Sequence, residues 1–254
     1  GAAGEDSTEP PRSAPYAYPP VAHEPRMQQL SDTFARLGLH PFHLPLGILL
    51  DETDGVVART SPCIRCGAFD GYPCLTNGKA DSQIICVDPA LRTHSNLALL
   101  TGAYVDKLVT DASGTRIDGV EVLQAGERTT YRADIVVVAC GALSSALLML
   151  RSANELHPHG LANGSGLVGR NYMRHNNSVL MAVSRIPNPT RFQKTLGLND
   201  FYYGSPDWDY PLGHIQMVGK SNAVQIRAEG LPNFLQWFPD KPFDWIARHS
   251  LDFW

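Results

Sequence analysis

Four of the five cysteines crowd into one stretch of the chain, Cys63–Cys86. Three of them, Cys63, Cys66 and Cys74, follow the spacing C-x2-C-x7-C. Two thiolates separated by two residues can coordinate one metal ion across a tight turn, and three could hold an iron–sulfur cluster. A zinc site would need a fourth ligand, from Cys86 or a histidine. The spacing also fits a disulfide between two of the three or reduced buried thiols, so all three interpretations stay open.

A second stretch, Ala133–Ser152, has the pattern of a strand, a glycine turn and a helix. The short valine-rich run Ile135–Ala139 predicts a strand that is buried on both faces. Gly141 lets the backbone turn, and Leu143–Ser152 has the length and composition of a helix. The helix N-terminus would then face the carboxyl end of a parallel strand. Nucleotide cofactors bind at that place in open α/β sheets.

Composition and charge bound the class of protein. The chain has 254 residues, of which 43% are hydrophobic and 18% charged, as in an ordinary globular protein. The net charge of -4 and the lack of a long run of Lys and Arg give no electrostatic reason to expect a nucleic-acid partner. No apolar run approaches the length of a membrane span, and the first residues lack the basic and apolar regions of a signal peptide.

Periodicity and turn residues predict the elements around these two stretches. An apolar stripe at spacings of three and four predicts a helix over Pro25–Gly38. A short apolar run, Leu97–Thr101, predicts a strand, and three further strands joined by turn residues predict a β-meander. The strands of this meander are Ala103–Val109, Arg116–Leu123 and Arg128–Tyr131.

From Ser178 the pattern changes to short strand-like runs rich in aromatic residues. These runs are Val179–Val183, Phe201–Tyr203 and His214–Gly219. A sheet with an aromatic face could line a sugar-binding pocket, because sugars stack on aromatic rings. A β-rich core explains the same aromatic residues equally well.

Taken together, these stretches resemble the glucose–methanol–choline (GMC) family of FAD-dependent oxidoreductases. Four pieces carry the resemblance in the family's order: Cys74–Asp81, Leu97–Val122, Ala133–Ser152 and Val168–His175. The third piece is similar to the second signature of the family, and the residues that fit it are Gly141, Ala142, Ser145, Leu148, Met149 and Ser152. Departures at Ala146, at Ala153, Asn154 and Glu155, and at Arg174 suggest a divergent bacterial branch and leave the substrate open.

The resemblance implies an α/β (α+β) fold with part of an FAD-binding Rossmann-like sheet and its β-meander, plus part of an antiparallel-sheet substrate domain. The implied division is 1–84 for a linker, helix and Cys-rich segment, 85–175 for the FAD-binding portion and 176–254 for the substrate-domain portion. The sequence shows neither the N-terminal strand–GxGxxG–helix unit of the family nor a counterpart of its C-terminal His–His or His–Asn pair. We therefore expect an internal fragment that is inactive by itself, with its catalytic residues unknown. The sequence leaves open whether the protein lies in the cytoplasm or in the periplasm of a bacterium.

The implied reaction is oxidation of an alcohol or sugar hydroxyl by hydride transfer to flavin. By resemblance, the residues that would contact FAD are Val105 through its backbone, Ala139, Cys140, Gly141 and Ala142 along the ADP portion, and Ser145 at the start of the helix. Some sugar dehydrogenases of the family carry an iron–sulfur cluster close to where Cys63, Cys66 and Cys74 fall. The implied partners are a small alcohol or sugar and an electron-acceptor subunit, with no nucleic acid and no membrane span.

Three other interpretations compete with this one. An NAD-linked Rossmann protein needs a glycine fingerprint between a first strand and a helix, followed by an acidic residue after the second strand, and the sequence shows no such unit. A non-catalytic β-rich domain could use the aromatic residues to bind carbohydrate. A metal-stabilised module is possible if the cysteines bind zinc.

Overall fold

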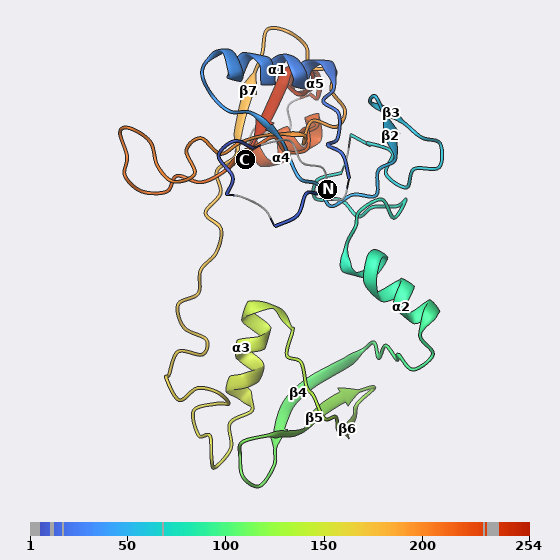
Figure 1. The fold of residues 1–254 in the computed structure, drawn as a ribbon, viewed down its shortest axis with the longest axis vertical. Helices are drawn as coiled ribbons and strands as arrows, with labels where there is room; N and C mark the ends of the chain where they lie inside the picture. The colour runs from blue at the N-terminus through green and yellow to red at the C-terminus, as the bar shows by residue number, and fades with distance from the viewer. Residues whose placement is uncertain (1–5, 11–12, 17, 68, 231, 233–238) are drawn as a thin grey trace. The chain divides into compact units, whose positions relative to one another are not determined.

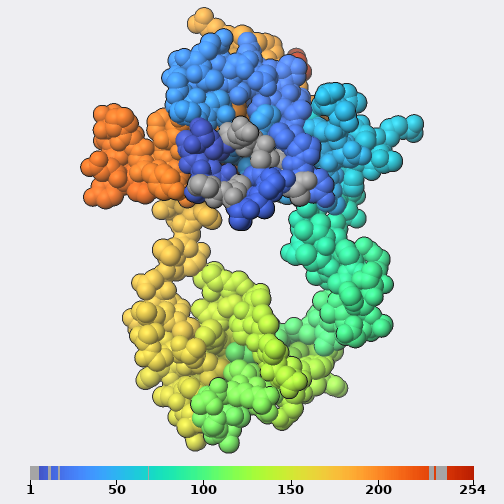
Figure 2. Space-filling model, viewed as in Figure 1, coloured from blue at the N-terminus to red at the C-terminus, as the bar shows by residue number. Residues whose placement is uncertain are grey.

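The computed structural model describes residues 6–10, 13–16, 18–67, 69–230, 232 and 239–254. The chain divides into two compact units, one made of Gly1–Arg92 with Asn177–Trp254 and the other of Thr93–Asn176. Figures 1 and 2 show that segments from both ends of the chain, coloured blue and orange to red, pack together in the first unit. Helices are combined with antiparallel sheets, and the fold is therefore α+β.

The first unit is built on the helix that the apolar stripe predicts. Helix α1, Pro25–Arg36, has proline in its first turn, and Gly38 follows its end with a φ of 83°. Met27 on this helix is fully buried, and Leu30 and Phe34 pack beside it. The core that they join is formed by Leu196, Met217 and Leu251. The prediction of this helix is confirmed.

The remaining elements of the first unit are short. The strands are β1 (Phe42–His43), β2 (Glu52–Thr53), β3 (Val56–Val57), β7 (Leu180–Val183), β8 (Leu196–Leu198), β9 (Ile215–Gln216) and β10 (Ser250–Phe253). Strand β8 lies between β1 and β9, β10 pairs with β7, and β2 pairs with β3. The helices are the π-helix η1 (Gln83–Val87), α2 (Asp88–Thr93), α4 (Ala223–Gly230) and α5 (Lys241–His249).

The second unit contains the predicted meander and one helix. Strands β4 (Ala103–Thr110), β5 (Ile117–Gln124) and β6 (Glu127–Tyr131) form an antiparallel sheet in sequence order, and helix α3 is Gly141–Arg151. Leu108 of the sheet and Leu148 of the helix are buried together with Leu161, which lies in the loop after α3. The meander and the helix are therefore confirmed.

Three predicted strands are wrong. Leu97–Thr101, Ile135–Ala139 and Phe201–Tyr203 are not strands in the structure. Ile135 and Val137 are 81% and 79% exposed, whereas Val136 and Val138 pack against the core of the second unit. A strand is buried on both faces only when it has neighbours in a sheet, and no strand among the described residues pairs with Ile135–Ala139. The expected parallel strand is therefore replaced by an extended segment with one buried side.

Candidate cofactor site

The start of α3 is set by the backbone conformation of Gly141. Its φ is 80°, in the left-handed region that glycine adopts without strain. A Cβ at this position would have open space around it, with nothing within 4 Å. Glycine is therefore required here for the turn itself. The amide of Cys140 donates a hydrogen bond to Ser145 Oγ at 3.0 Å, which fixes the residue before the helix.

The N-terminus of α3 can attract an anion. The first amides of any helix have no partner within it, and they carry the positive end of the helix dipole. The first turn contains no acidic side chain, and its residues Gly141, Ala142, Leu143 and Ser144 are exposed. Ser145 was expected to open the helix, but it lies in the second turn. A phosphate group is the ligand that such a terminus favours.

A cavity of about 310 Å³ lies between the meander and the segment that leads into α3. Val105 and Cys140, two of the residues predicted to contact FAD, line it together. Ala139, Gly141, Ala142 and Ser145 are not in its lining; the first three are exposed and Ser145 is half-buried. The structure thus brings two of the predicted residues to one cavity and places the others next to Cys140 along the chain.

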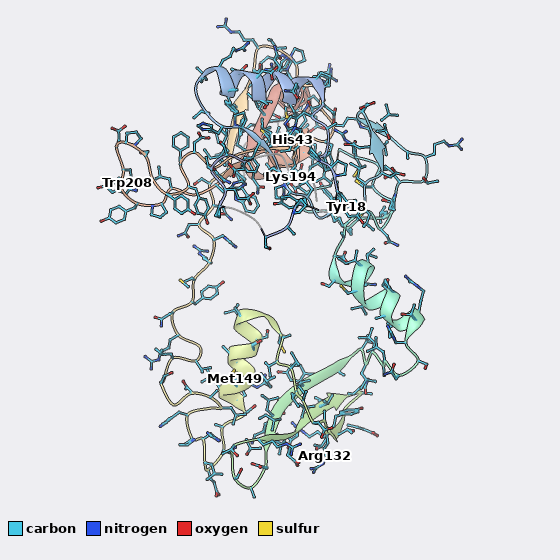
Figure 3. The ribbon with its side chains drawn as sticks, in the orientation of Figure 1. Tyr18, His43, Arg132, Met149, Lys194 and Trp208 are labelled. Carbon is cyan, nitrogen blue, oxygen red and sulfur yellow. The ribbon has the colours of Figure 1, made fainter. Side chains whose placement is uncertain are left out.

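Arg132 also lines this cavity, and the sequence reasoning missed it. Figure 3 shows Arg132 beside the meander. Its guanidinium forms an ion pair with Asp118 and stays largely exposed. Arg132 directly follows the last strand of the meander and precedes the run Ala133–Ser152, and a basic residue at this place was the signal that could have identified it. Arginine is well suited to bind a phosphate group.

A β-bulge distorts β4 directly beside Val105. The register of β4 against β5 shifts between Val105 and Lys107, so that Asp106 is the extra residue. The Asp106 carboxylate accepts hydrogen bonds from Arg128 at 2.7 Å and from Arg151 at 2.5 Å. These hydrogen bonds hold the pKa of Asp106 below its usual value. The bulge leaves backbone beside Val105 outside the sheet ladder, where a ligand could contact it.

The three predicted metal-binding cysteines line a second cavity, of about 650 Å³, in the first unit. Cys63 is buried, Cys66 and Cys74 are half-buried, and all three are free thiols. The walls of the cavity are mainly apolar, with Phe69 and Phe192 among them. The two rings lie 4.3 Å apart between their centroids.

The thiols differ in their chemical environment. Burial raises the pKa of Cys63. The pKa of Cys74 is lowered to about 7, first by the hydroxyl of Thr76 at 3.5 Å and also by backbone amides, including that of Gly78 at 3.2 Å from Sγ. Hydrogen bonds to a thiolate favour the charged form. Cys74 is therefore the more reactive of these two thiols.

The cysteines do not form a metal site within the described residues. No group of three or more His, Cys, Asp and Glu side chains in that part of the chain is arranged to hold a metal ion. The prediction of a zinc or iron–sulfur site at Cys63, Cys66 and Cys74 therefore finds no support in the side-chain geometry. A spacing of C-x2-C shows that two sulfurs can converge, but the conformation of the intervening loop decides whether they do.

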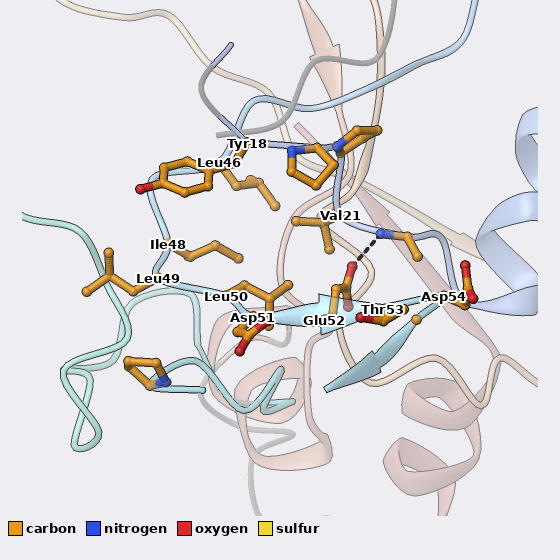
Figure 4. A pocket seen from close by; sticks show the side chains of 15 residues that line it. Tyr18, Val21, Leu46, Ile48, Leu49, Leu50, Asp51, Glu52, Thr53 and Asp54 are labelled. Atoms are coloured by element: carbon orange, nitrogen blue, oxygen red, sulfur yellow. Dashed lines mark hydrogen bonds between the residues drawn. The ribbon is translucent and has the colours of Figure 1, made fainter. Parts of the chain in front are cut away.

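A third cavity, of about 630 Å³, lies beside β2 in the first unit (Figure 4). Apolar side chains such as Leu46, Ile48 and Leu50 line it, and Tyr18 lies next to Leu46. The carboxylate of Glu52 accepts hydrogen bonds from the Ala22 amide at 2.7 Å and from the guanidinium of Arg65 at 2.8 Å. The carboxylate of Glu52 thus connects the segments that contain Ala22 and Arg65.

None of the helices in the described ranges is long and apolar enough to cross a membrane.

Comparison with known proteins bears on the second unit most directly. Residues 52–177 match the family described as GMC oxidoreductase. These residues belong to the GMC oxidoreductase family. The match covers the meander, the cavity beside Val105 and Cys140, and all of α3, so the helix N-terminus described above is a feature of a GMC segment.

Three relatives are named as oxidases or as a dehydrogenase. The chain is 39% identical over 138 residues to 6'''-hydroxyparomomycin C oxidase of Streptomyces lividus, covering 53% of this chain and 24% of the relative. It is 36% identical over 156 residues to paromamine 6'-oxidase of Streptomyces fradiae, covering 61% of this chain and 27% of the relative. It is 32% identical over 111 residues to 2-methyl-1,2-propanediol dehydrogenase of Mycolicibacterium austroafricanum, covering 42% of this chain and 20% of the relative. The aligned part therefore spans about a quarter of the first two relatives.

Proposed function

We propose that this chain is part of an FAD-dependent oxidoreductase that oxidises an alcohol or sugar hydroxyl. The observation that carries the proposal is the juxtaposition of Val105 and Cys140 at one cavity beside the exposed N-terminus of α3. This juxtaposition lies inside the segment that belongs to the GMC family. The relatives are named as oxidases and as a dehydrogenase, which supports the reaction class.

The residues of the second unit have features that suit the nucleotide end of the cofactor. The start of α3 offers unpaired amides and a positive dipole end for a phosphate group. The left-handed Gly141 turns the chain so that these amides are exposed. Arg132 lines the cavity, where a phosphate group could replace Asp118 as the partner of its exposed guanidinium, and the bulge beside Val105 offers backbone groups to a base. We assign residues 85–175 to this FAD-binding portion and residues 176–254 to the substrate portion.

Bound FAD would supply the two-electron oxidant for the alcohol carbon. The protein residues named above bind and orient this group. The substrate, the electron acceptor and a partner subunit belong to the whole protein and follow from this proposal only as classes: an alcohol or sugar, and an acceptor of two electrons.

The test is a visible absorption spectrum of the purified protein that contains this chain, before and after addition of FAD. We expect flavin bands that bleach when an alcohol or sugar substrate is added. Cys140→Trp should abolish flavin retention, because the indole would fill the cavity shared with Val105. A matched control is Cys86→Trp, which adds the same bulk at an exposed cysteine outside this cavity.

Two results would overturn the proposal. A protein that stays colourless after incubation with FAD has no flavin site. A Cys140→Trp variant that retains as much flavin as Cys86→Trp would place the cofactor elsewhere on the chain.

A further inference from the structure

The cavity that Cys63, Cys66 and Cys74 line has the size and the lining of a small-molecule site. Its volume is about 650 Å³, in the range of cavities that enclose most of a small organic ligand. None of its described lining residues lies within 85–175, the portion assigned to FAD. The apolar side chains of the lining include Leu46, Ile48, Ile64, Phe69, Tyr72 and Phe192. An apolar ligand would therefore have much of its surface removed from water here.

Two lysines hold the part of the wall that carries Phe69 and Tyr72. Nζ of Lys79 donates to the carbonyl oxygen of Phe69 at 2.9 Å and to that of Tyr72 at 2.7 Å. Between these two residues, the carboxylate of Asp70 accepts a hydrogen bond from Lys194 at 3.1 Å, and Figure 3 labels this lysine. The wall is thus fastened to segments before and after it in the chain, and the cavity is preformed.

The sulfur of Cys74 is surrounded by donors on its own loop. The amide of Gly78 donates to this sulfur at 3.2 Å, and the hydroxyl of Thr76 lies 3.5 Å from it. Asn77, between these two residues, has a φ of 55°, and such a left-handed turn reverses the chain toward Cys74. Hydrogen bonds donated to sulfur favour the thiolate, which is the nucleophilic form. Cys74 is half-buried in the lining, so a bound ligand can reach its sulfur.

Cys63 lies close to the same loop but in a different environment. A Cβ at Gly78 would lie 2.7 Å from the Cα of Cys63, so only glycine permits this close approach of the two segments. Cys63 is buried, and burial raises the pKa of its thiol. Cys63 therefore stays protonated at neutral pH, and Cys74 is the stronger nucleophile of the two.

We propose that this cavity binds a small apolar α,β-unsaturated carbonyl compound and that Cys74 captures it covalently. The sulfur of Cys74 forms a bond to the β-carbon, the carbon–carbon double bond becomes a single bond, and the α-carbon takes up a proton from water. No oxidant takes part and no group leaves. The apolar part of the compound packs on the wall with Phe69 and Phe192, which holds the β-carbon beside the thiolate. This reaction does not depend on flavin binding.

The experiment compares two probes, N-methylmaleimide and N-benzylmaleimide, on the purified full-length protein. Both are cyclic α,β-unsaturated carbonyl compounds with the same reactive double bond, and only the second carries an apolar ring. Mass spectrometry gives the rates of alkylation at Cys74 and at Cys86, an exposed cysteine outside this cavity. The benzyl group should raise the Cys74 rate about tenfold relative to the Cys86 rate, because the ring is buried before the bond forms.

A non-reactive analogue separates binding from intrinsic reactivity. N-benzylsuccinimide carries the same ring but has no double bond, so it occupies the cavity without reacting. Titration calorimetry gives its dissociation constant. At about ten times this concentration it should slow the alkylation of Cys74 by N-methylmaleimide about tenfold, because only the unoccupied protein reacts. The rate at Cys86 should stay unchanged.

Variants test whether the preference arises in this cavity. Tyr72→Ala removes a partly exposed part of the wall and should reduce the benzyl preference at Cys74 about threefold. Tyr203→Ala is the matched control, because this exposed tyrosine lies outside the lining and its removal should leave the preference intact. Circular dichroism confirms that both variants are folded. Flavin content is measured separately, so that this proposal and that of an FAD site can fail independently.

The proposal fails under any of four results. An equal benzyl effect at Cys74 and Cys86 would mean that the cavity does not bind the ring. Failure of N-benzylsuccinimide to protect Cys74 would mean the same. Faster alkylation of Cys63 or Cys66 would assign the reaction to another thiol. A preference that is the same in Tyr72→Ala and Tyr203→Ala would show that the wall of this cavity does not select the ligand.

Discussion

Ser152 Oγ accepts a hydrogen bond from the amide of Leu108 at 2.9 Å and so joins the end of α3 to the middle of β4. The same hydroxyl donates to the carbonyl oxygen of Leu148 at 2.6 Å. Ser152 is fully buried, so no solvent competes for either hydrogen bond. Helix α3 can therefore hold its N-terminus at a fixed place relative to the bulge beside Val105.

Ser152→Ala should destabilise the second unit. The substitution leaves the buried amide of Leu108 without its acceptor, which costs about 1–3 kcal/mol. Ser144→Ala, on the exposed first turn of the same helix, should change the free energy of unfolding by less than about 0.5 kcal/mol. Denaturant unfolding of both variants measures this difference. Equal stability of the two would mean that the buried serine contributes nothing to the attachment of α3.

Gly141→Ala should lower both stability and flavin retention. Alanine at a φ of 80° costs about 1–2 kcal/mol, because its Cβ approaches the following carbonyl oxygen. Gly164→Ala is a matched control, since a Cβ there also has nothing within 4 Å and the backbone is not left-handed. Thermal unfolding and flavin content of the two variants are compared. If Gly141→Ala behaved like Gly164→Ala, the left-handed turn would not be what starts the helix.

Cys74 should react with iodoacetamide at neutral pH. Its pKa is lowered to about 7, so half of the thiol is thiolate near that pH and the alkylation rate should rise through it. Thr76→Val removes the hydroxyl beside Sγ and should move the rate profile to higher pH, whereas Thr60→Val, at an exposed threonine, should not. Mass spectrometry of the Cys74 peptide gives the rate. A Thr76→Val profile that coincides with the unmodified protein would contradict the role of this hydroxyl.

Local sequence signals predicted the elements that are stabilised by contacts close in sequence. The stripe Met27, Leu30 and Phe34 identified α1, and turn residues at Gly114 and Gly126 identified the meander. The strand prediction over Ile135–Ala139 was wrong because a valine-rich composition indicates a preference for burial but does not show that a neighbouring strand is present. The same limit applies to the cysteines, since their spacing does not determine the conformation of the loop between them.

Long-range contacts account for what the sequence did not reveal. Strands β8 and β10 were missed because each is only a few residues long and owes its place to pairing with β1, β9 or β7. A small cavity at β1 and β9 is lined by residues far apart in the chain, among them His43 and His214, and the two histidines carry no spacing signal. Val105 and Cys140 were found only through a resemblance, because nothing in their local sequence shows that they line one cavity.

His23 should make the first unit less stable as the pH falls. Its Nδ1 lies 2.8 Å from Thr195 Oγ1, and burial, His43 and Arg65 together lower its pKa from 6.5 to about 3. The unfolded chain therefore takes up a proton between about pH 6.5 and about pH 3 that the folded chain does not. Stability is fully present above pH 6.5 and is lost as the pH falls, with a slope of up to about 1.4 kcal/mol per pH unit.

The comparison of His23→Gln with the unmodified protein isolates this effect. Glutamine keeps a polar group near Thr195 but does not titrate, so the variant should lose stability less steeply between about pH 6.5 and about pH 4. His94→Gln, at an exposed histidine, should keep the steep dependence. Urea unfolding across this range measures the slopes. Parallel slopes for His23→Gln and the unmodified protein would show that the stacked histidine already binds its proton in the folded state.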